Sequence, residues 1–165
     1  MRTSGVPFTF PLRVRSIASA RGTWTVVAIL VLVQLAVSLA GGHVRVPRLY
    51  EALGETRPAV LSGEVWRLLT YGLLHGGWAH VTLNAVCLLV LGARIEGILG
   101  RTAVWRALVF GTIAGGIFHV LAVPWEADTA ILVGFSGGCM ALLLLLTTLS
   151  PQSSIGPLPL SARSL

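Results

Sequence analysis

Four apolar segments constrain the fold of this chain more than any other feature of its sequence. They cover about residues 24–40, 78–94, 107–123 and 130–149. A helix needs about 20 apolar residues to cross the hydrocarbon layer of a bilayer. Because 55% of the 165 residues are hydrophobic and only 11% are charged, the composition lies outside the usual range of soluble domains. The sequence therefore predicts an all-α, polytopic membrane helical bundle, with residues 24–149 as one membrane domain.

Arginine positions predict the orientation of the bundle. Residues 1–23 hold four arginines and no acidic residue, and the connection between the second and third segments holds Arg94, Arg101 and Arg106. The positive-inside rule then puts the N-terminal tail and the segment 150–165 in the cytoplasm. Four arginines in the loop 43–77 count against this orientation, although three glutamates offset them. We expect an integral protein of the bacterial cytoplasmic membrane with a cytoplasmic N-terminus.

Two alternative interpretations of these features are less well supported. The sequence "SLA" at residues 38–40 looks like a signal-peptide cleavage site, but the apolar run is longer than a typical signal sequence and 23 residues precede it. We therefore expect an uncleaved first helix. The net charge of +6 does not indicate nucleic-acid binding, because the arginines flank apolar segments instead of forming a stripe with interleaved aromatic residues.

The loop 43–77 is unusually long for a connection between helices, and loops of that length tend to carry function or structure of their own. It contains "GEVWRLLTYGLLHGG", residues 63–77, whose middle is amphipathic. We expect this stretch to lie along the membrane surface, with Trp66 and Tyr71 at the interface. In the third segment, Gly111 and Gly115 share one face, which favours close approach of a neighbouring helix.

Three polar side chains inside the apolar segments are the candidate functional residues. His80 and Asn84 are four residues apart, so they lie on one face of the second helix. Ser136 is expected about 9 Å below the start of the fourth helix, at a similar depth. Each residue alone has a structural explanation, since serine often bonds the i−4 carbonyl and His or Asn often links two helices. Their convergence at one depth favours chemistry instead.

A serine hydroxyl becomes a nucleophile when a base takes its proton, and the oxyanion that follows needs hydrogen-bond donors. Asn84, His80 and the backbone amide of Ser136 are the expected donors. Three glycines would let a substrate backbone approach the hydroxyl, namely Gly134, Gly137 and Gly138. The run "GFSGG" also matches the G-x-S-x-G elbow of soluble hydrolases, but that motif requires a preceding strand, which an all-helical chain does not offer.

Three sequence stretches, "WRLLTYGLLHGGWAHVTLN", "GARIEG" and "GFSGG", occur in this order in successive helices. Together they resemble the rhomboid family of intramembrane serine proteases, over about residues 63–149. The resemblance implies a six-helix bundle, of which four helices are present here. It also implies cleavage of transmembrane protein substrates near the outer membrane face, with the lipid bilayer as the other partner and without nucleic acid.

The resemblance also implies roles for individual residues. Ser136 would be the nucleophile, and His80 with Asn84 would stabilise the oxyanion. The membrane-embedded first loop would include Trp66 and Arg67, tied down by hydrogen bonds of His75. Glu96 and the glycines beside it would hold the second helix and the loop after it, and Gly134 and Gly137 belong to the serine motif.

Two departures from the family pattern stand out. Met140 occupies the position one turn after the serine, where the family often has a tyrosine. The fifth and sixth helices are absent, and the family's catalytic histidine lies on the sixth. Of the four histidines, His119 could be imagined as a substitute base, but we expect it to pack between helices. The final "PLPLSARSL" resembles the stretch before the fifth helix, so we expect a C-terminally truncated fragment of a protease.

Two other functions remain open at this point. A non-catalytic rhomboid-like protein could bind transmembrane segments without cutting them. A transporter could use the polar residues as an ion route, although no acidic residue lies in the middle of a segment. Serine acyl transfer needs no metal or cofactor, so we expect neither. Cys87 and Cys139 lie in apolar segments, where free cysteine behaves as a small hydrophobe.

Overall fold

The computed structural model describes residues 17–122 and 130–149, and this part of the chain is helical, as predicted. The long elements are α1 (Arg21–Leu39), α5 (Trp78–Cys87), α6 (Ala93–Leu99), α7 (Arg101–Ala122) and α8 (Ser136–Leu149). The short ones are η1 (Ile17–Ser19), α2 (Pro47–Leu53), α3 (Arg57–Leu61), α4 (Arg67–Thr70) and η2 (Tyr71–Leu73). A π-helical turn, η3 (Leu88–Gly92), joins α5 to α6 without a break in the helix.

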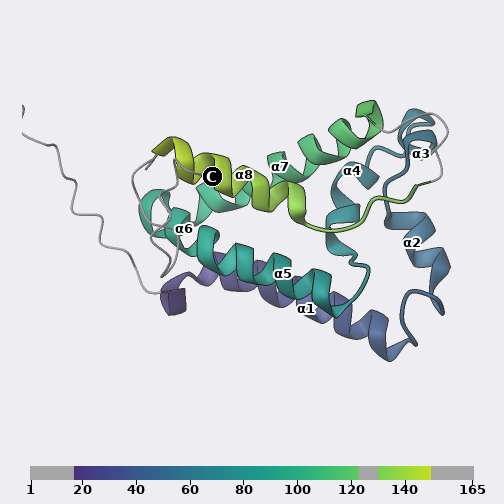
Figure 1. The fold of residues 1–165 in the computed structure, drawn as a ribbon, viewed down its shortest axis with the longest axis horizontal. Coiled ribbons are helices and arrows are strands. Elements are labelled where there is room, and N and C mark those ends of the chain that lie inside the picture. The colour runs from purple at the N-terminus through teal and green to yellow at the C-terminus, as the bar shows by residue number, and fades with distance from the viewer. Residues whose placement is uncertain (1–16, 123–129, 150–165) are drawn as a thin grey trace, which may run out of the picture.

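Figure 1 shows how these elements are arranged. α1 and α5 lie side by side, α7 packs extensively against α8, and α2, α3 and α4 gather at one end of the molecule. The core lies where the long helices meet. Leu30 of α1, Leu88 of η3, Leu108 of α7 and Leu142 of α8 are buried together in one apolar cluster. α8 therefore sits on a surface built from α7 and the middle of the second apolar segment.

Three helices of the described residues are long and apolar enough to cross a bilayer, namely Arg21–Leu39, Trp78–Leu99 and Arg101–Ala122. The last two differ from the predicted bounds 78–94 and 107–123. One residue, Gly100, separates them, and its φ of +84° allows a sharp turn that other residues rarely adopt. Arg94, Arg101 and Arg106 consequently lie on helices and not in a loop. Long arginine side chains can reach water from the end of a membrane helix.

The predicted fourth helix, 130–149, begins later in the structure than the sequence predicted. α8 begins at Ser136 and has 14 residues. Leu132 instead forms an isolated antiparallel bridge with Glu55, and Gly134 has a φ of +113°, which a helix cannot contain. Apolar composition cannot distinguish a helix from an extended buried segment, so the sequence did not show this boundary.

The spacing of Gly111 and Gly115 predicted the close approach of a neighbouring helix, and in the structure that helix is α8. A Cβ atom placed on Gly111 would lie 2.7 Å from the carbonyl oxygen of Gly137 and 2.4 Å from the Cβ of Ala141. Such distances are shorter than real carbon contacts, so a side chain at Gly111 would push the two helices apart. The start of α8 is therefore placed by backbone contact with α7.

Glu96 anchors the start of α1 on α6. Its carboxylate accepts hydrogen bonds from the amide of Gly22 at 2.9 Å, from the amide of Thr23 at 2.8 Å, and from the Thr23 hydroxyl at 2.9 Å. The first amides of a helix have no partner within it, and the helix dipole favours an anion there. The resemblance assigned Glu96 to the second helix and the loop after it. The hydrogen bonds run to the first helix instead.

The loop 43–77 is held by side chains that donate to the end of α2. Arg67 donates through Nη1 to the carbonyl of Gly54 at 2.8 Å and to that of Glu51, while Thr70 donates to Leu53 at 2.8 Å. Trp66 adds a longer bond to Ala52 at 3.4 Å. The last carbonyls of a helix lack internal partners, so these donors cap α2.

Tyr71 differs from the sequence prediction. It was expected at the membrane interface beside Trp66, but only 1% of its surface is exposed, whereas Trp66 is 52% exposed. The Tyr71 hydroxyl donates to the carbonyl of Thr112 in α7 at 2.7 Å. A buried hydroxyl needs such an acceptor, which a sequence pattern cannot reveal.

Candidate functional site

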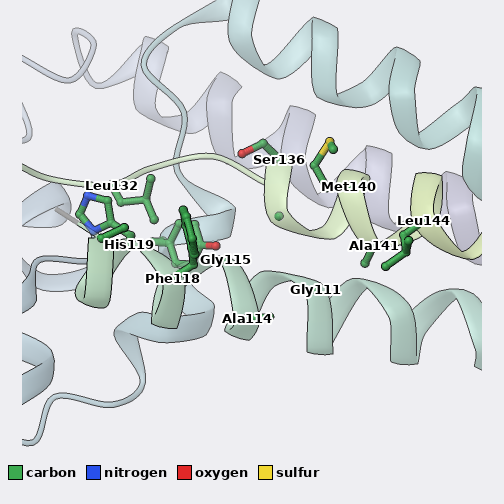
Figure 2. Close-up of a pocket in the computed structure, with 13 residues that line it drawn as sticks. Gly111, Ala114, Gly115, Phe118, His119, Leu132, Ser136, Met140, Ala141 and Leu144 are labelled. Carbon is green, nitrogen blue, oxygen red and sulfur yellow. The ribbon is translucent and has the colours of Figure 1, made fainter. Parts of the chain in front are cut away.

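Ser136 is the first residue of α8, and its side chain is exposed. The prediction that it lies about 9 Å below the start of a helix is wrong, because the residues before it are not helical. Ser136 opens into a groove of about 910 Å³ lined mainly by α7, α8 and Tyr71. Figure 2 shows Ser136 and Met140 on the α8 wall of this groove, with Gly111, Gly115 and Phe118 along the α7 wall.

The segment 131–135 that leads to Ser136 is held by hydrogen bonds to the loop 43–77. The Glu55 amide donates to the Leu132 carbonyl at 3.1 Å, and the Leu132 amide donates to the Glu55 carbonyl at 2.8 Å. The Gly134 amide donates to the Tyr71 carbonyl at 3.0 Å. The serine therefore follows an extended segment with a single bridge, and the expectation of a purely helical context was only partly right.

His80 packs on Gly134, two residues before the serine. A Cβ on Gly134 would lie 2.5 Å from Cε1 and 2.6 Å from Nε2 of His80. The imidazole thus occupies the space that a side chain at this position would fill. A glycine is required here for a second reason, because φ is +113°. The structure brings His80 against the segment that carries Ser136.

Asn84 lies against the same part of α8. It is buried, and its Oδ1 and its carbonyl oxygen are each 3.8 Å from the Sγ atom of Cys139, three residues after Ser136. Its amide nitrogen Nδ2 has no hydrogen-bond partner among the described residues. Buried donors are nearly always paired, so an unpaired one needs an explanation. His80 and Asn84 reach α8 from α5, whereas the groove is lined from α7 and α8.

His75 lies behind His80. Its side chain is 1% exposed, and the two rings meet edge to face with centroids 5.0 Å apart. Burial, with a smaller electrostatic contribution from the neighbouring His80, lowers the pKa of His75 to about 4. It is therefore neutral at pH 7. Neither ring nitrogen has a hydrogen-bond partner among the described residues, so the predicted side-chain bonds of His75 are not found there. Its backbone carbonyl instead accepts a hydrogen bond from the Tyr50 hydroxyl at 2.7 Å, which ties the end of the loop to α2.

Arg67 is buried and neutralised within the loop. Its Nε donates to Oε2 of Glu64 at 2.7 Å, and Nη2 is 2.6 Å from the same oxygen. A planar guanidinium can thus bind the carboxylate and the α2 carbonyls together, which a lysine could not do. These bonds all lie within the loop 43–77, and none of them involves Ser136.

Sequence reasoning missed two residues of this site, Tyr71 and Glu55. Tyr71 links α7 through its hydroxyl and the serine segment through its carbonyl. Glu55 is fully buried, and its Oε2 lies 2.7 Å from Nδ1 of His119. His119 was predicted to pack between helices, but it lies against Glu55 in the turn between α2 and α3 and lines the groove, and this acidic partner is 64 residues away. Only the scarcity of acidic residues, six in the chain, could have drawn attention to Glu55.

All four histidines lie in the part of the chain that the structure describes. Within that part, no histidine hydrogen-bonds the Ser136 hydroxyl. His80 faces Gly134, His75 faces His80, His43 faces Tyr50, and His119 faces Glu55. In Figure 2, His119 and Leu132 lie together at one end of the groove, away from Ser136. The described residues also contain no group of three or more His, Cys, Asp or Glu side chains that could hold a metal ion.

Comparison with known proteins identifies the family. The family model of the Rhomboid domain matches residues 62–161. The chain belongs to the rhomboid family. Rhomboid-related protein 3 of Homo sapiens is 41% identical over 83 residues, which are 50% of this chain and 20% of the human protein. The match thus spans about a fifth of that rhomboid relative. No solved structure matches the chain. The resemblance predicted from "WRLLTYGLLHGGWAHVTLN", "GARIEG" and "GFSGG" is confirmed.

Proposed function

We propose that this rhomboid-family protein is an intramembrane serine endopeptidase that cleaves transmembrane protein substrates near the outer membrane face. One observation carries the proposal. The buried Asn84 side chain contacts Cys139 in the first turn of α8 through Oδ1, and its amide nitrogen has no partner among the described residues. α8 begins with the exposed Ser136 hydroxyl. A donor fixed without a partner in the resting protein is suited to a negative charge that forms during a reaction.

The proposed chemistry follows serine acyl transfer. A base takes the proton of the Ser136 hydroxyl, and Oγ attacks the carbonyl carbon of the scissile bond. The carbonyl oxygen becomes an oxyanion, which Asn84 Nδ2, an imidazole N–H of His80 and the Ser136 amide would stabilise. Amides in the first turn of a helix are free of helical partners, and the dipole of α8 favours negative charge there. The amine leaves with the proton from the base, and water then releases the acyl group.

The base is expected from a further helix. The family resemblance implies a histidine on a sixth helix, and the groove beside Ser136 is where such a helix could dock. Glycine and alanine line both walls of the groove, including Gly115, Gly137 and Ala141, so a helix backbone could approach closely. A histidine on that helix would reach Ser136 from the α7 side, opposite His80 and Asn84.

A second function, binding of transmembrane segments without cleavage, is favoured by a different observation. No histidine of this chain hydrogen-bonds Ser136 in the described residues. An alcohol without a base is a weak nucleophile. The same groove could then hold an apolar helix and leave its peptide bonds intact.

The proposed orientation has the N-terminus in the cytoplasm of a bacterial cell. The arginines of loop 43–77, which counted against it, are partly neutralised. Arg57 and Arg67 are buried, and Arg67 pairs with Glu64. At the opposite end, Arg101 packs on Gly22 beside Arg21. This distribution supports the positive-inside argument at the N-terminal end of α1.

Fluorophosphonate labelling tests the proposed function. We expect the full-length protein, including the helix that supplies the base, to be labelled at Ser136 in lipid vesicles and to cleave a transmembrane substrate. Ser136→Ala should abolish labelling and lower cleavage by at least about 1,000-fold, because no other group forms the acyl enzyme. Ser62→Ala is the matched control, since this exposed serine bonds only Ala59 and should leave both signals intact. Substrate binding without labelling would favour the non-catalytic function.

A further inference from the structure

We propose that Glu55 is a positioning residue for Ser136, which fixes the segment 131–135 through Leu132 and His119. An effect of Glu55 on catalysis depends on the protease function proposed above. The contacts that hold the segment 131–135 to Glu55 belong to the fold and do not depend on that function. Glu55 lies in the turn between α2 and α3, at the end of the molecule where the loop 43–77 meets α7 (Figure 1).

The backbone bridge between the loop 43–77 and the segment 131–135 involves a single residue on each side. Glu55 and Leu132 exchange two hydrogen bonds, of 3.1 and 2.8 Å, and no neighbouring pair extends the bridge. Gly54 adds contact, because a Cβ there would lie 2.5 Å from Cγ2 of Ile131. Leu132 is four residues before Ser136, so a shift of Leu132 passes along a short extended segment to the hydroxyl. One bridge is a weak attachment unless other groups stabilise it.

The side chain of Glu55 supplies that support. Its carboxyl group is fully buried, and Oε2 lies 2.7 Å from Nδ1 of His119 in the last turn of α7. The two atoms are within ion-pair distance, although neither has a hydrogen bond of good geometry among the described residues. Arg57, also buried, donates through Nε to the carbonyl of Val120 at 2.6 Å. The turn that carries Glu55 is therefore fixed to the end of α7 by two polar contacts.

A buried carboxyl group is costly, and an apolar side chain would fill this space without that cost. His119 and Leu132 both line the groove into which Ser136 opens, and Figure 2 shows both at the same end of it. The Glu55 attachment thus forms one end wall of the groove as well as the support of the segment. Its location fits a role in positioning the serine.

Protonation should affect this attachment near neutral pH. Burial raises the pKa of Glu55 from its ordinary 4.5 to about 7, and the positive charge of Arg57 opposes this shift. Besides His119 and Arg57, Tyr71 faces Glu55, and burial together with the Glu55 charge raises the pKa of Tyr71 to about 12. Because the folded protein binds the Glu55 proton more tightly, its contribution to stability is complete below pH 4.5 and is lost as pH rises through about 7.

The test compares Glu55→Gln with the wild type in lipid vesicles between pH 5 and 9, both as the full-length protein that includes the helix supplying the base. Glu51→Gln is the matched control, because Glu51 is an exposed acid on the neighbouring α2. Two quantities are measured: the rate of fluorophosphonate labelling of Ser136, and the hydrogen exchange of the amides of Leu132 and Gly134. We expect Glu55→Gln to slow labelling by about 10- to 100-fold, the usual effect of misplacing a reacting group by about 1 Å.

The pH profile separates positioning from general support. Wild type should show a change in labelling and in amide protection centred near pH 7, which Glu55→Gln lacks and Glu51→Gln retains. Equal labelling rates and equal protection in Glu55→Gln and wild type would overturn the inference. If the wild type is not labelled at any pH, the proposed protease function fails. In that case, hydrogen exchange of the Leu132 amide still tests the inference. Unchanged protection of this amide in Glu55→Gln would refute the role of Glu55 in holding the segment, and faster exchange would support it.

Discussion

Gly134 shows how a single position can govern the site. The His80 ring occupies the place of its missing side chain, and its backbone adopts a conformation that favours glycine. The Gly134 amide also donates to the Tyr71 carbonyl. His80, Tyr71 and the serine segment therefore meet at one residue. A change there should alter the position of the proposed oxyanion donor before it alters the rest of the bundle.

We expect Gly134→Ala to lower the labelling rate of Ser136 by about 100-fold, because the new methyl group displaces the His80 imidazole. Gly63→Ala is the matched control. Gly63 has a φ of +104°, so the substitution brings a similar backbone strain, but nothing lies within 4 Å of its Cβ position. Both variants should lose about 1–2 kcal/mol of stability. Equal labelling rates in the two variants would show that the His80 contact is unimportant.

Contacts between elements in this protein depend on helix ends. Glu96 of α6 binds the first amides of α1, and Trp66, Arg67 and Thr70 bind the last carbonyls of α2. Helix ends are the only places where a helix offers unpaired backbone groups. Side chains from other elements that satisfy these groups fix the ends relative to each other, which apolar packing alone does not do.

Glu96→Gln tests the contact between α6 and α1. A carboxamide keeps the shape but loses the charge, and one of its two ends is a donor that cannot accept from an amide. We expect the free energy of unfolding in detergent micelles to fall by about 2 kcal/mol. Glu51→Gln should leave the unfolding free energy unchanged, because its side chain is exposed. An unchanged midpoint in Glu96→Gln would mean that packing alone holds α1.

The molecule as a whole has two unlike ends. At one end, the start of α1 lies beside the junction of α6 and α7, where Arg21 and Arg101 are found. At the other end, the loop 43–77 covers the end of α7 and supports the segment before Ser136 (Figure 1). Ser136 is thus closer to the loop than to the arginine-bearing end. In the proposed orientation, a substrate would be cut on the outer side of the membrane.

Cysteine accessibility tests this orientation. In a variant without Cys87 and Cys139, Ser62→Cys in the loop should react with a membrane-impermeant maleimide added outside intact cells. Thr102→Cys, at the start of α7, should react only after the cells are opened. Both positions are exposed in the structure, so the contrast reports the side of the membrane and not burial. The reverse pattern would invert the proposed orientation.

Much of this protein was predictable because the relevant signals are local. Apolar runs of membrane length predicted the helical class and the approximate helices. The spacing of Gly111 and Gly115 predicted a close helix contact, and the structure identifies α8 as the partner. His80 and Asn84 share a helix face, and the structure places both against the start of α8. Helix starts were less accurate, since hydrophobicity does not distinguish residues 130–135 from a helical turn.

Other contacts join residues far apart in the chain, and no local pattern encodes them. Glu96 binds Thr23 across 73 residues, Tyr71 binds Thr112 across 41, and Glu55 pairs with Leu132 and His119. Each contact involves polar groups that packing buries away from water, and buried polar groups are nearly always paired with another group of the protein. Membrane helices and a candidate serine follow from the order of residues. The position of that serine follows from which buried donors and acceptors the folded bundle brings together.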